Sequence, residues 1–215
     1  MVIVIGGIKG GSGKTTLSTN LCVLRSLSGQ KILLVDTDEQ RSSSEWAEHR
    51  ESLNIETPWT TIQLEGEAVR TQIPKLKKDY DEVIVDVGAG NTNSQRAALM
   101  VASILIAPFQ PRCLDVWTVD KLSKLIQEAR MFNPDLKVFA VINKAEARGK
   151  DNHRAVEVLK KMSGVECLKN MICQRKAFSN AIAEGLGVIE LTPKDLKAIS
   201  EIQNLNNIII KLKLC

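Results

Sequence analysis

The chain has 215 residues and a formal net charge of +4, with 44% hydrophobic, 25% charged and 4% aromatic residues. This composition is typical of a globular domain with a sizeable core, and so few aromatic side chains disfavour nucleic-acid binding by base stacking. The five cysteines include no C-x-x-C pair, and no apolar run reaches membrane-spanning length, so we expect one domain over residues 1–215 in the reducing cytoplasm.

A glycine-rich segment, Gly6–Thr16, connects the first predicted strand to the first predicted helix. Val2–Ile5 is an apolar run, and Leu17–Leu27 carries leucines at helical spacing. Glycine N–H groups can surround an anion, and a helix N-terminus adds positive potential. We expect Lys14 to contact the outer phosphates of a nucleotide and Thr15 to offer its hydroxyl to Mg²⁺. The full set of expected nucleotide-binding residues here is Gly10, Gly11, Ser12, Gly13, Lys14, Thr15 and Thr16.

Two features distinguish this segment from the general phosphate-binding pattern. G-x-x-x-x-G-K-[ST] would place glycine where the chain has Ile8, and a second lysine, Lys9, precedes Lys14 by five residues. The segment resembles the deviant Walker A motif of the ParA/MinD ATPase family. In that family the early lysine reaches the partner's nucleotide across a dimer. The resemblance therefore implies a catalytic role in trans for Lys9, beside the role of Lys14 in its own site.

Two carboxylates follow the second predicted strand, Lys31–Val35. Asp36 and Asp38 lie at the strand end, where open α/β sheets bind ligands. We expect Asp36 to hold a magnesium-bound water and Asp38 to orient the attacking water as a catalytic residue. The alternative is a pair of turn or capping aspartates. The segment resembles the family's D-x-D-P-Q sequence, with Glu39 in place of the proline.

The next segments complete the first half of the predicted sheet. Ser42–Arg50 is expected to be a helix with Trp46 on its inner face, and Thr60–Leu64 a short strand. Gly66–Lys78 is expected to be a helix interrupted at Pro74.

The strand Tyr80–Asp86 ends in a carboxylate, which is the Walker B arrangement. Such a carboxylate approaches Mg²⁺ through water, so we expect Asp86 to belong to the metal site. A strand-end cap is the alternative. Val87–Gly90 resembles the family's second switch loop, which senses the γ-phosphate.

The second half begins with a helix, Asn93–Met100, and a strand, Ser103–Ala107. The loop Phe109–Asp115 resembles a proline-containing loop that packs near the dimer interface in small ParA proteins. A helix over Asp115–Met131 is expected to place Trp117 against the core.

Asn143 and Lys144 follow the predicted strand Lys137–Ile142. An Asn-Lys pair at a strand end can hydrogen-bond a purine edge. The guanine signature N-K-x-D is incomplete because Glu146 replaces its aspartate. The resemblance favours adenine, with Asn143 as its contact.

Basic residues gather in the C-terminal third, around the predicted helix Ala145–Lys161 and after the predicted strand Cys167–Ile172. They either form a solvated face, the common meaning of such runs, or bind DNA phosphates. The DNA-binding candidates are Arg148, Lys150, Arg154, Arg175 and Lys176.

The last predicted helix is expected to begin with Thr192 as its cap and Pro193 at its first position. In the tail, Asn206–Cys215, lysines alternate with apolar residues, so no clean apolar face forms for a membrane. The tail is expected to pack as the end of that helix.

These motifs extend from the first strand to the last helix and resemble a small ParA-type partition ATPase, without a helix-turn-helix extension. The resemblance implies an α/β fold with a doubly wound, mostly parallel sheet, of the P-loop NTPase kind. It also implies ATP and Mg²⁺ as cofactors, weak Mg²⁺-dependent ATP hydrolysis, an ATP-dependent homodimer and non-specific DNA binding on the nucleoid. A small centromere-binding, ParB-type partner would stimulate hydrolysis, and no stable membrane association is expected.

Three alternatives stay open. The first is a MinD-like membrane ATPase, and the second is a relative of the nitrogenase iron protein, for which Cys113 would be the candidate cluster ligand. The third is an ATP-dependent ligase of the dethiobiotin-synthetase kind.

Overall fold

The computed structural model describes residues 1–114, 116–146 and 150–214. Its centre is a seven-stranded sheet in the order β3-β2-β4-β1-β5-β6-β7, and every pairing is parallel. The strands are β1 Val2–Ile5, β2 Ile32–Asp36, β3 Thr60–Gln63, β4 Glu82–Asp86, β5 Ile104–Phe109, β6 Lys137–Ala145 and β7 Glu166–Cys173. The predicted doubly wound α/β fold is confirmed, and the sheet is entirely parallel rather than mostly so.

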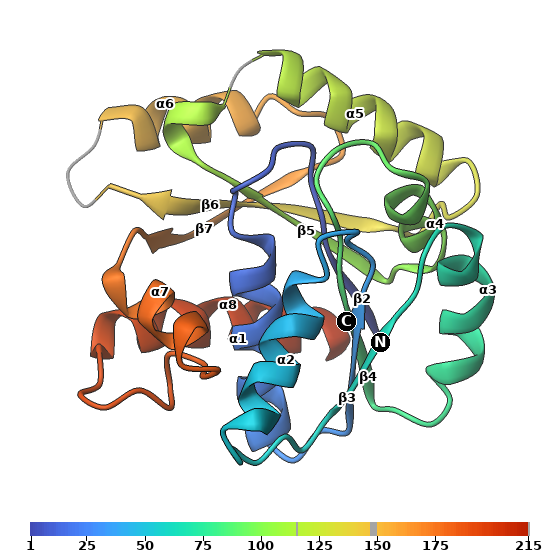
Figure 1. Ribbon diagram of the computed structural model, residues 1–215. Coiled ribbons are helices and arrows are strands. Elements are labelled where there is room, and N and C mark those ends of the chain that lie inside the picture. The colour runs from blue at the N-terminus through green and yellow to red at the C-terminus, as the bar shows by residue number, and fades with distance from the viewer. Residues whose placement is uncertain (115, 147–149, 215) are drawn as a thin grey trace.

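Helices cover both faces of the sheet (Figure 1). They are α1 Lys14–Leu27, α2 Ser42–Ser52, α3 Glu67–Leu76, α4 Asn93–Val101, α5 Val116–Arg130, α6 Lys150–Leu159, α7 Lys176–Ala183 and α8 Leu196–Leu214, with a short 3₁₀ helix, η1 Pro111–Cys113. Strand β1 shows why there are two cores, because its side chains alternate between the faces. Val2 and Val4 pack with α3, α4, α5 and α6, whereas Ile3 and Ile5 pack with α1, α2, α7 and α8. Among the described helices, none is long and apolar enough to cross a bilayer.

Helix α3 continues through Pro74, so the predicted interruption is wrong. Proline removes one backbone donor, and here that loss falls in the last turn of the helix. Val69 and Ile73 are fully buried and anchor the helix on the sheet, and the N–H of Lys77 still reaches the carbonyl of Ile73 at 2.9 Å. Burial of the apolar face therefore outweighs one missing hydrogen bond.

Helix α8 begins at Leu196, so the predicted cap at Thr192 and start at Pro193 are wrong. The carboxylate Oδ1 of Asp195 accepts hydrogen bonds from the N–H groups of Lys197 and Ala198, each at 3.0 Å. Aspartate is a strong N-cap because it satisfies these first-turn donors. The tail continues α8 as predicted, with Ile209 buried in the core.

Two of the three tryptophans are paired inside the molecule. Trp46 on α2 is buried, as predicted, and stacks on Trp59 with ring centroids 5.6 Å apart and an interplanar angle of 6°. The guanidinium of Arg50 lies 5.0 Å from the centre of the Trp59 ring. This pair packs α2 against the segment that leads into β3.

The third tryptophan, Trp117, is 77% exposed, so the predicted core contact is wrong. The buried face of α5 is formed by Leu122, Leu125 and Ile126. Trp117 precedes Leu122 by five residues, which is about 140° around a helix, and so it points away from that face.

Candidate nucleotide-binding site

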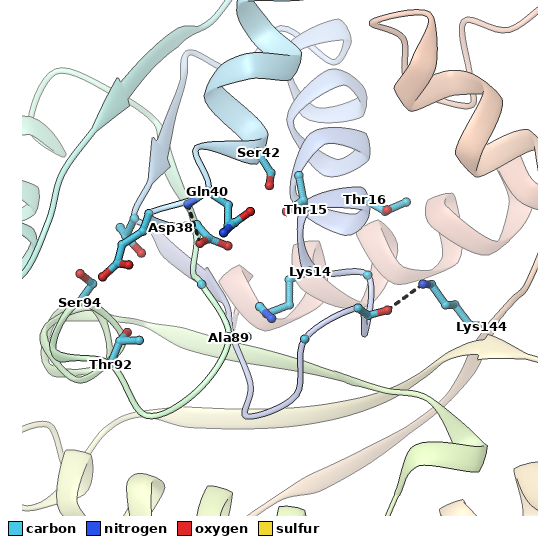
Figure 2. A pocket seen from close by; sticks show the side chains of 16 residues that line it. Lys14, Thr15, Thr16, Asp38, Gln40, Ser42, Ala89, Thr92, Ser94 and Lys144 are labelled. Atoms are coloured by element: carbon cyan, nitrogen blue, oxygen red, sulfur yellow. Dashed lines mark hydrogen bonds between the residues drawn. The ribbon is translucent and has the colours of Figure 1, made fainter.

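A pocket of about 590 Å³ lies at the carboxyl ends of the central strands (Figure 2). Its walls come from the P-loop (Gly6–Thr16), the loop after β2, the loop after β4 and the end of β6. The lining residues are Gly10, Gly11, Gly13, Lys14, Thr15, Thr16, Thr37, Asp38, Glu39, Gln40, Ser42, Gly88, Ala89, Thr92, Ser94 and Lys144. Segments that are far apart in the sequence thus meet at one opening.

The P-loop leads directly into α1. Gly13 is the residue before the helix and has a left-handed φ of 90°, a conformation that favours glycine. The structure, which describes this whole segment, shows no side chain capping α1 and no acidic residue in its first turn. The N-terminal N–H groups of α1 are therefore suited to an anionic ligand.

Lys14 is mostly buried and its ammonium lies inside the loop. Its Nζ donates a hydrogen bond to the backbone carbonyl of Lys9 at 3.3 Å. Burial lowers the pKa of this ammonium, while the charges of Asp86 and Asp38 oppose that shift. In Figure 2, Lys14 and Asp38 reach the pocket from different elements, α1 and the loop after β2.

The P-loop is held from behind by side chains from β6 and from the loop after β5. Asn143 Nδ2 donates to the carbonyl of Ser12 at 2.7 Å, and Lys144 Nζ donates to the carbonyl of Gly11 at 2.7 Å. Gln110 Nε2 also donates to the carbonyl of Gly11. A Cβ at Gly13 would lie 2.2 Å from Asn143 Nδ2, so glycine is required for this approach.

Asn143 is thus engaged with the P-loop, and its contact with adenine stays a prediction. The Asn-Lys pair is visible in the sequence, but no sequence pattern indicates that Lys144 and Gln110 hold the loop. Lys144 has a left-handed φ of 54°, which is uncommon for a residue with a side chain.

A second pocket, of about 210 Å³, adjoins the first at Thr16 and Lys144. We call it the side pocket. Its lining is Thr16, Asn143, Lys144, Cys173, Gln174, Arg175, Phe178 and Ser179. It therefore lies between the ends of β6 and β7, beside the start of α1.

Asp36 is buried at the end of β2 and organises the loop that follows. Its Oδ1 accepts the N–H of Asp38 at 3.0 Å, and its Oδ2 accepts the N–H of Ser44 in the first turn of α2 at 2.8 Å. The carboxylate thereby fixes both the loop and the start of α2. Its role toward a magnesium-bound water stays a prediction.

Asp38 is partly exposed and lines the pocket. Its Oδ1 accepts the N–H of Gln40 at 3.0 Å. A Cβ at Gly88 would lie 3.1 Å from the carboxyl carbon of Asp38, so the loop after β4 passes very close to it. The two loops that flank the phosphate side of the pocket therefore touch at Asp38 and Gly88.

Asp86 is fully buried at the end of β4. Its Oδ1 accepts the hydroxyl of Ser18 at 3.0 Å, and within the described residues its buried Oδ2 has no hydrogen-bond partner. Burial raises the pKa of this carboxyl to about 7, and the charge of Asp36 adds to the shift; the nearby Thr15 and Ser18 hydroxyls and the charge of Lys14 oppose it.

This unpaired carboxylate oxygen fits a magnesium site. Mg²⁺ prefers hard oxygen ligands, and in phosphate sites it uses one or two carboxylates together with phosphate oxygens and water. The Thr15 hydroxyl, close to Asp86, supplies a further oxygen.

Gln95, at the start of α4, is a buried residue that the sequence analysis missed. Its Oε1 accepts the N–H of Gly7 at 2.7 Å, and its Nε2 donates to the carbonyl of Gly90 at 2.7 Å. It therefore links the P-loop to the loop after β4. No motif signalled it, because glutamine on a helix is typical of an exposed position.

Lys9 is half-buried in the P-loop, and its backbone carbonyl accepts the hydrogen bond from the Lys14 ammonium. Its backbone borders a small crevice with Pro108, Phe109 and Gln110. Its predicted action on a partner's nucleotide concerns a dimer and stays a prediction.

The predicted DNA-binding residues do not form one flat patch. Lys150 and Arg154 are exposed on α6, whereas Lys176 is exposed at the start of α7, a helix that packs on the opposite face of the sheet. Arg175 is ion-paired with Glu201 on α8, with Nη2 and Oε1 2.6 Å apart. Arg148 lies outside the described residues.

Comparisons with known proteins agree with this geometry. The family model "CobQ/CobB/MinD/ParA nucleotide binding domain" matches residues 3–188. Over 209 residues the chain is 28% identical to maintenance of carboxysome distribution protein A of Halothiobacillus neapolitanus, covering 97% of this chain and 95% of that protein. Over 205 residues it is 24% identical to protein ParA of Rhizobium radiobacter, covering 94% and 91%. A plasmid partition protein of Borrelia burgdorferi B31, solved with AMPPNP, has a TM-score of 0.76 at 22% identity over 98% of both chains.

Proposed function

Because the chain belongs to the CobQ/CobB/MinD/ParA nucleotide-binding domain family, we propose that it is a ParA-type ATPase that drives DNA partition. It hydrolyses ATP with Mg²⁺, forms an ATP-dependent sandwich homodimer and binds DNA without sequence preference. The observation that carries this proposal is that Lys14 and Asp38 line one pocket and that the charges of Asp38 and of the buried Asp86 both act on the Lys14 ammonium.

The P-loop binds the phosphates of ATP. Its glycine N–H groups and the N-terminus of α1 surround them, and the Lys14 ammonium neutralises the outer ones. The side pocket takes the base and ribose, because it adjoins the phosphate pocket at Thr16. Asn143 contributes there mainly by fixing the P-loop through Ser12.

Thr15, Asp36 and Asp86 would hold the metal, the two aspartates partly through water. Mg²⁺, when bound, neutralises negative charge on the phosphate oxygens. Thr15 offers its hydroxyl, Asp86 offers the unpaired Oδ2, and Asp36 keeps the neighbouring loop in place.

Hydrolysis uses Asp38 to orient the attacking water, since its carboxylate lines the pocket beside the loop after β4. Lys9 of the partner subunit adds positive charge at the phosphates, as an arginine finger does. The chain's own residues thus bind and position ATP, and dimerisation completes the site.

A turnover assay tests this function and separates it from the ligase alternative. The purified protein should release phosphate from MgATP without any small-molecule acceptor, and Lys14→Ala should abolish ATP binding. A protein that turns over ATP only when a small carboxylic-acid or amine substrate is added would be a ligase.

DNA binding is tested by its salt dependence. If six to ten phosphates are engaged, affinity should drop by about 10³–10⁵ between about 50 and about 200 mM salt. Lys150→Glu with Arg154→Glu, or Lys176→Glu alone, should weaken binding to arbitrary duplex DNA and leave the ATP dimer intact. Lys75→Glu with Lys77→Glu is the control, because these lysines lie on and just after α3, away from α6 and α7 (Figure 1). Equal loss in the control would show that only net charge matters.

The membrane alternative predicts a different partner surface. Ile202, Leu205 and Ile209 of α8 are buried against the sheet and so are not available to a bilayer. We expect negligible ATP-dependent sedimentation with anionic liposomes. Liposome binding that disappears when Lys211–Cys215 is deleted, together with no DNA binding at low salt, would favour the membrane ATPase.

The cargo has a second candidate, because one relative is a carboxysome distribution protein. For DNA cargo, hydrolysis should be stimulated by a small ParB-type protein that itself binds a centromere sequence. For a protein assembly, the stimulating partner would bind that assembly and no specific DNA site. ATPase assays with the product of the neighbouring gene, combined with a DNA-binding assay on that product, distinguish the two.

A further inference from the structure

Glu201, on α8, makes a concentrated set of contacts with the end of β7. Its Oε2 accepts the N–H of Cys173 at 3.0 Å and Arg175 Nε at 3.2 Å, and its Oε1 accepts Arg175 Nη2 at 2.6 Å. Its own backbone carbonyl accepts Asn170 Nδ2 at 3.1 Å. The Glu201 side chain is only 14% exposed, so this carboxylate is largely shielded from solvent.

These contacts fix a loop that forms one wall of the side pocket. Cys173, Gln174 and Arg175 all line that pocket. The loop is tied on its other side by the N–H of Gln174, which donates to the carbonyl of Ala145 at 2.9 Å. Glu201 and the end of β6 therefore hold residues 173–175 between them.

The phosphate side of the site has separate supports. The P-loop is held by Asn143, Lys144 and Gln110, and the loops near the γ-phosphate are held by Asp36 and Gln95. None of those hydrogen bonds involves Glu201, Cys173 or Arg175, so we expect a change at Glu201 to act first on the 173–175 wall of the side pocket.

We propose that Glu201 is a positioning residue for the base of the nucleotide, acting through Cys173 and Arg175 to keep the side-pocket wall in its binding geometry. This rests on the proposed function, in which the side pocket receives the base. Arg175 is then the partner of Glu201 in this wall, and its charge is already neutralised before any DNA phosphate approaches.

The test compares nucleotide affinity with turnover. Glu201→Ala should weaken both ATP and ADP by about tenfold, a change of about 1.4 kcal/mol, because both carry the same base. The rate at saturating ATP should stay within about twofold, since the γ-phosphate contacts are untouched. Asn204→Ala, an exposed position on the same helix, is the control and should change neither quantity.

Arg175→Met is the second variant, and it keeps the bond between Glu201 and the N–H of Cys173. It should weaken the binding of both ATP and ADP by less than tenfold, and this outcome can be measured even if Glu201→Ala fails to fold. Unchanged nucleotide affinity in a folded Glu201→Ala or Arg175→Met protein would overturn the inference. So would a loss of saturated turnover as large as the loss of affinity. Failure of the proposed function is distinct, because the unmodified protein would then bind neither ATP nor ADP.

Discussion

Asp86 keeps a proton at a pH where most carboxyl groups have lost theirs. Its pKa of about 7 exceeds the ordinary value of 3.8 because the carboxyl is fully buried. The folded state thus binds this proton more tightly than the unfolded state. Its contribution to stability is complete at low pH and is lost as the pH rises from about 4 to about 7.

Asp86→Asn should therefore stabilise the nucleotide-free protein, and increasingly so at higher pH. The advantage in unfolding free energy should grow by roughly 2 kcal/mol between about pH 5 and about pH 8. Urea unfolding at the two pH values measures it, with Asp135→Asn at an exposed site as control. The same variant should bind MgATP with weaker Mg²⁺ dependence. A gain in stability that does not depend on pH would show that the buried charge of Asp86 is not its cause.

Asp38→Ala should separate binding from hydrolysis. The variant should bind ATP and dimerise, because the P-loop and Lys14 are unchanged, while turnover should fall by about 10²–10⁴. Size-exclusion chromatography with ATP and a phosphate-release assay together report both properties. A variant that has normal ATP affinity but stays monomeric would argue against this role.

The sequence was most informative about the site where a motif fixes both the residue type and the strand or helix next to it. The placement of Lys14 and Asp38 in one pocket, with the buried Asp86 behind them, follows from glycine spacing and strand ends. The pairing of Arg175 with Glu201 was not foreseeable, because the two are 26 positions apart on different elements. A basic residue after a strand carries no local sign of its partner.

Whole elements were predictable when burial and periodicity agreed, and less so at their ends. The strands and helices appear in the expected order, yet α3 passes Pro74 and α8 starts at Leu196. Both differences arise from forces that a local pattern does not contain, namely the buried face of α3 and the capping bonds of Asp195.

Gln95 joins two elements of the site, and its removal should uncouple them. Gln95→Leu leaves the buried N–H of Gly7 and the carbonyl of Gly90 without this partner, which should cost roughly 2–4 kcal/mol of stability. Hydrogen exchange should rise in the loop after β4, and turnover should fall. Gln127→Leu, on the exposed side of α5, is the matched control. Unaltered exchange in that loop would exclude a coupling role.

At the scale of the whole molecule, one chain holds the P-loop and the carboxylates of the proposed nucleotide site. The remaining positive charge, the Lys9 ammonium, is predicted to come from a second copy of the chain. Lys9 borders the small crevice beside Phe109, whereas Lys14 lines the large pocket. The fold was predictable from the succession of motifs. The proposed dimer could not be checked in the same way, because its contacts would need a second copy of the chain.

Lys9→Ala and Lys14→Ala should therefore behave differently. Lys14→Ala should lose tight ATP binding, whereas Lys9→Ala should keep it and lose dimerisation and hydrolysis. Without the Lys9 charge of the partner subunit, the rate of ATP hydrolysis should fall by about 10³–10⁵. Calorimetry gives the affinity and light scattering gives the mass. Equal loss of ATP affinity in both variants would defeat this division.

The stacked pair of Trp46 and Trp59 also gives the protein a spectroscopic signal of its own. Two buried indoles stacked 5.6 Å apart should give a near-ultraviolet circular dichroism band that depends on their relative orientation. Helix α2 begins just after the loop of Asp38, so a shift of that helix would change the band without any attached dye. Trp117 is solvent-exposed and should emit at longer wavelength than the buried pair. In a Trp117→Phe variant, the buried pair would be the sole source of tryptophan fluorescence. These two signals would report in real time whether α2 moves after ATP is mixed in.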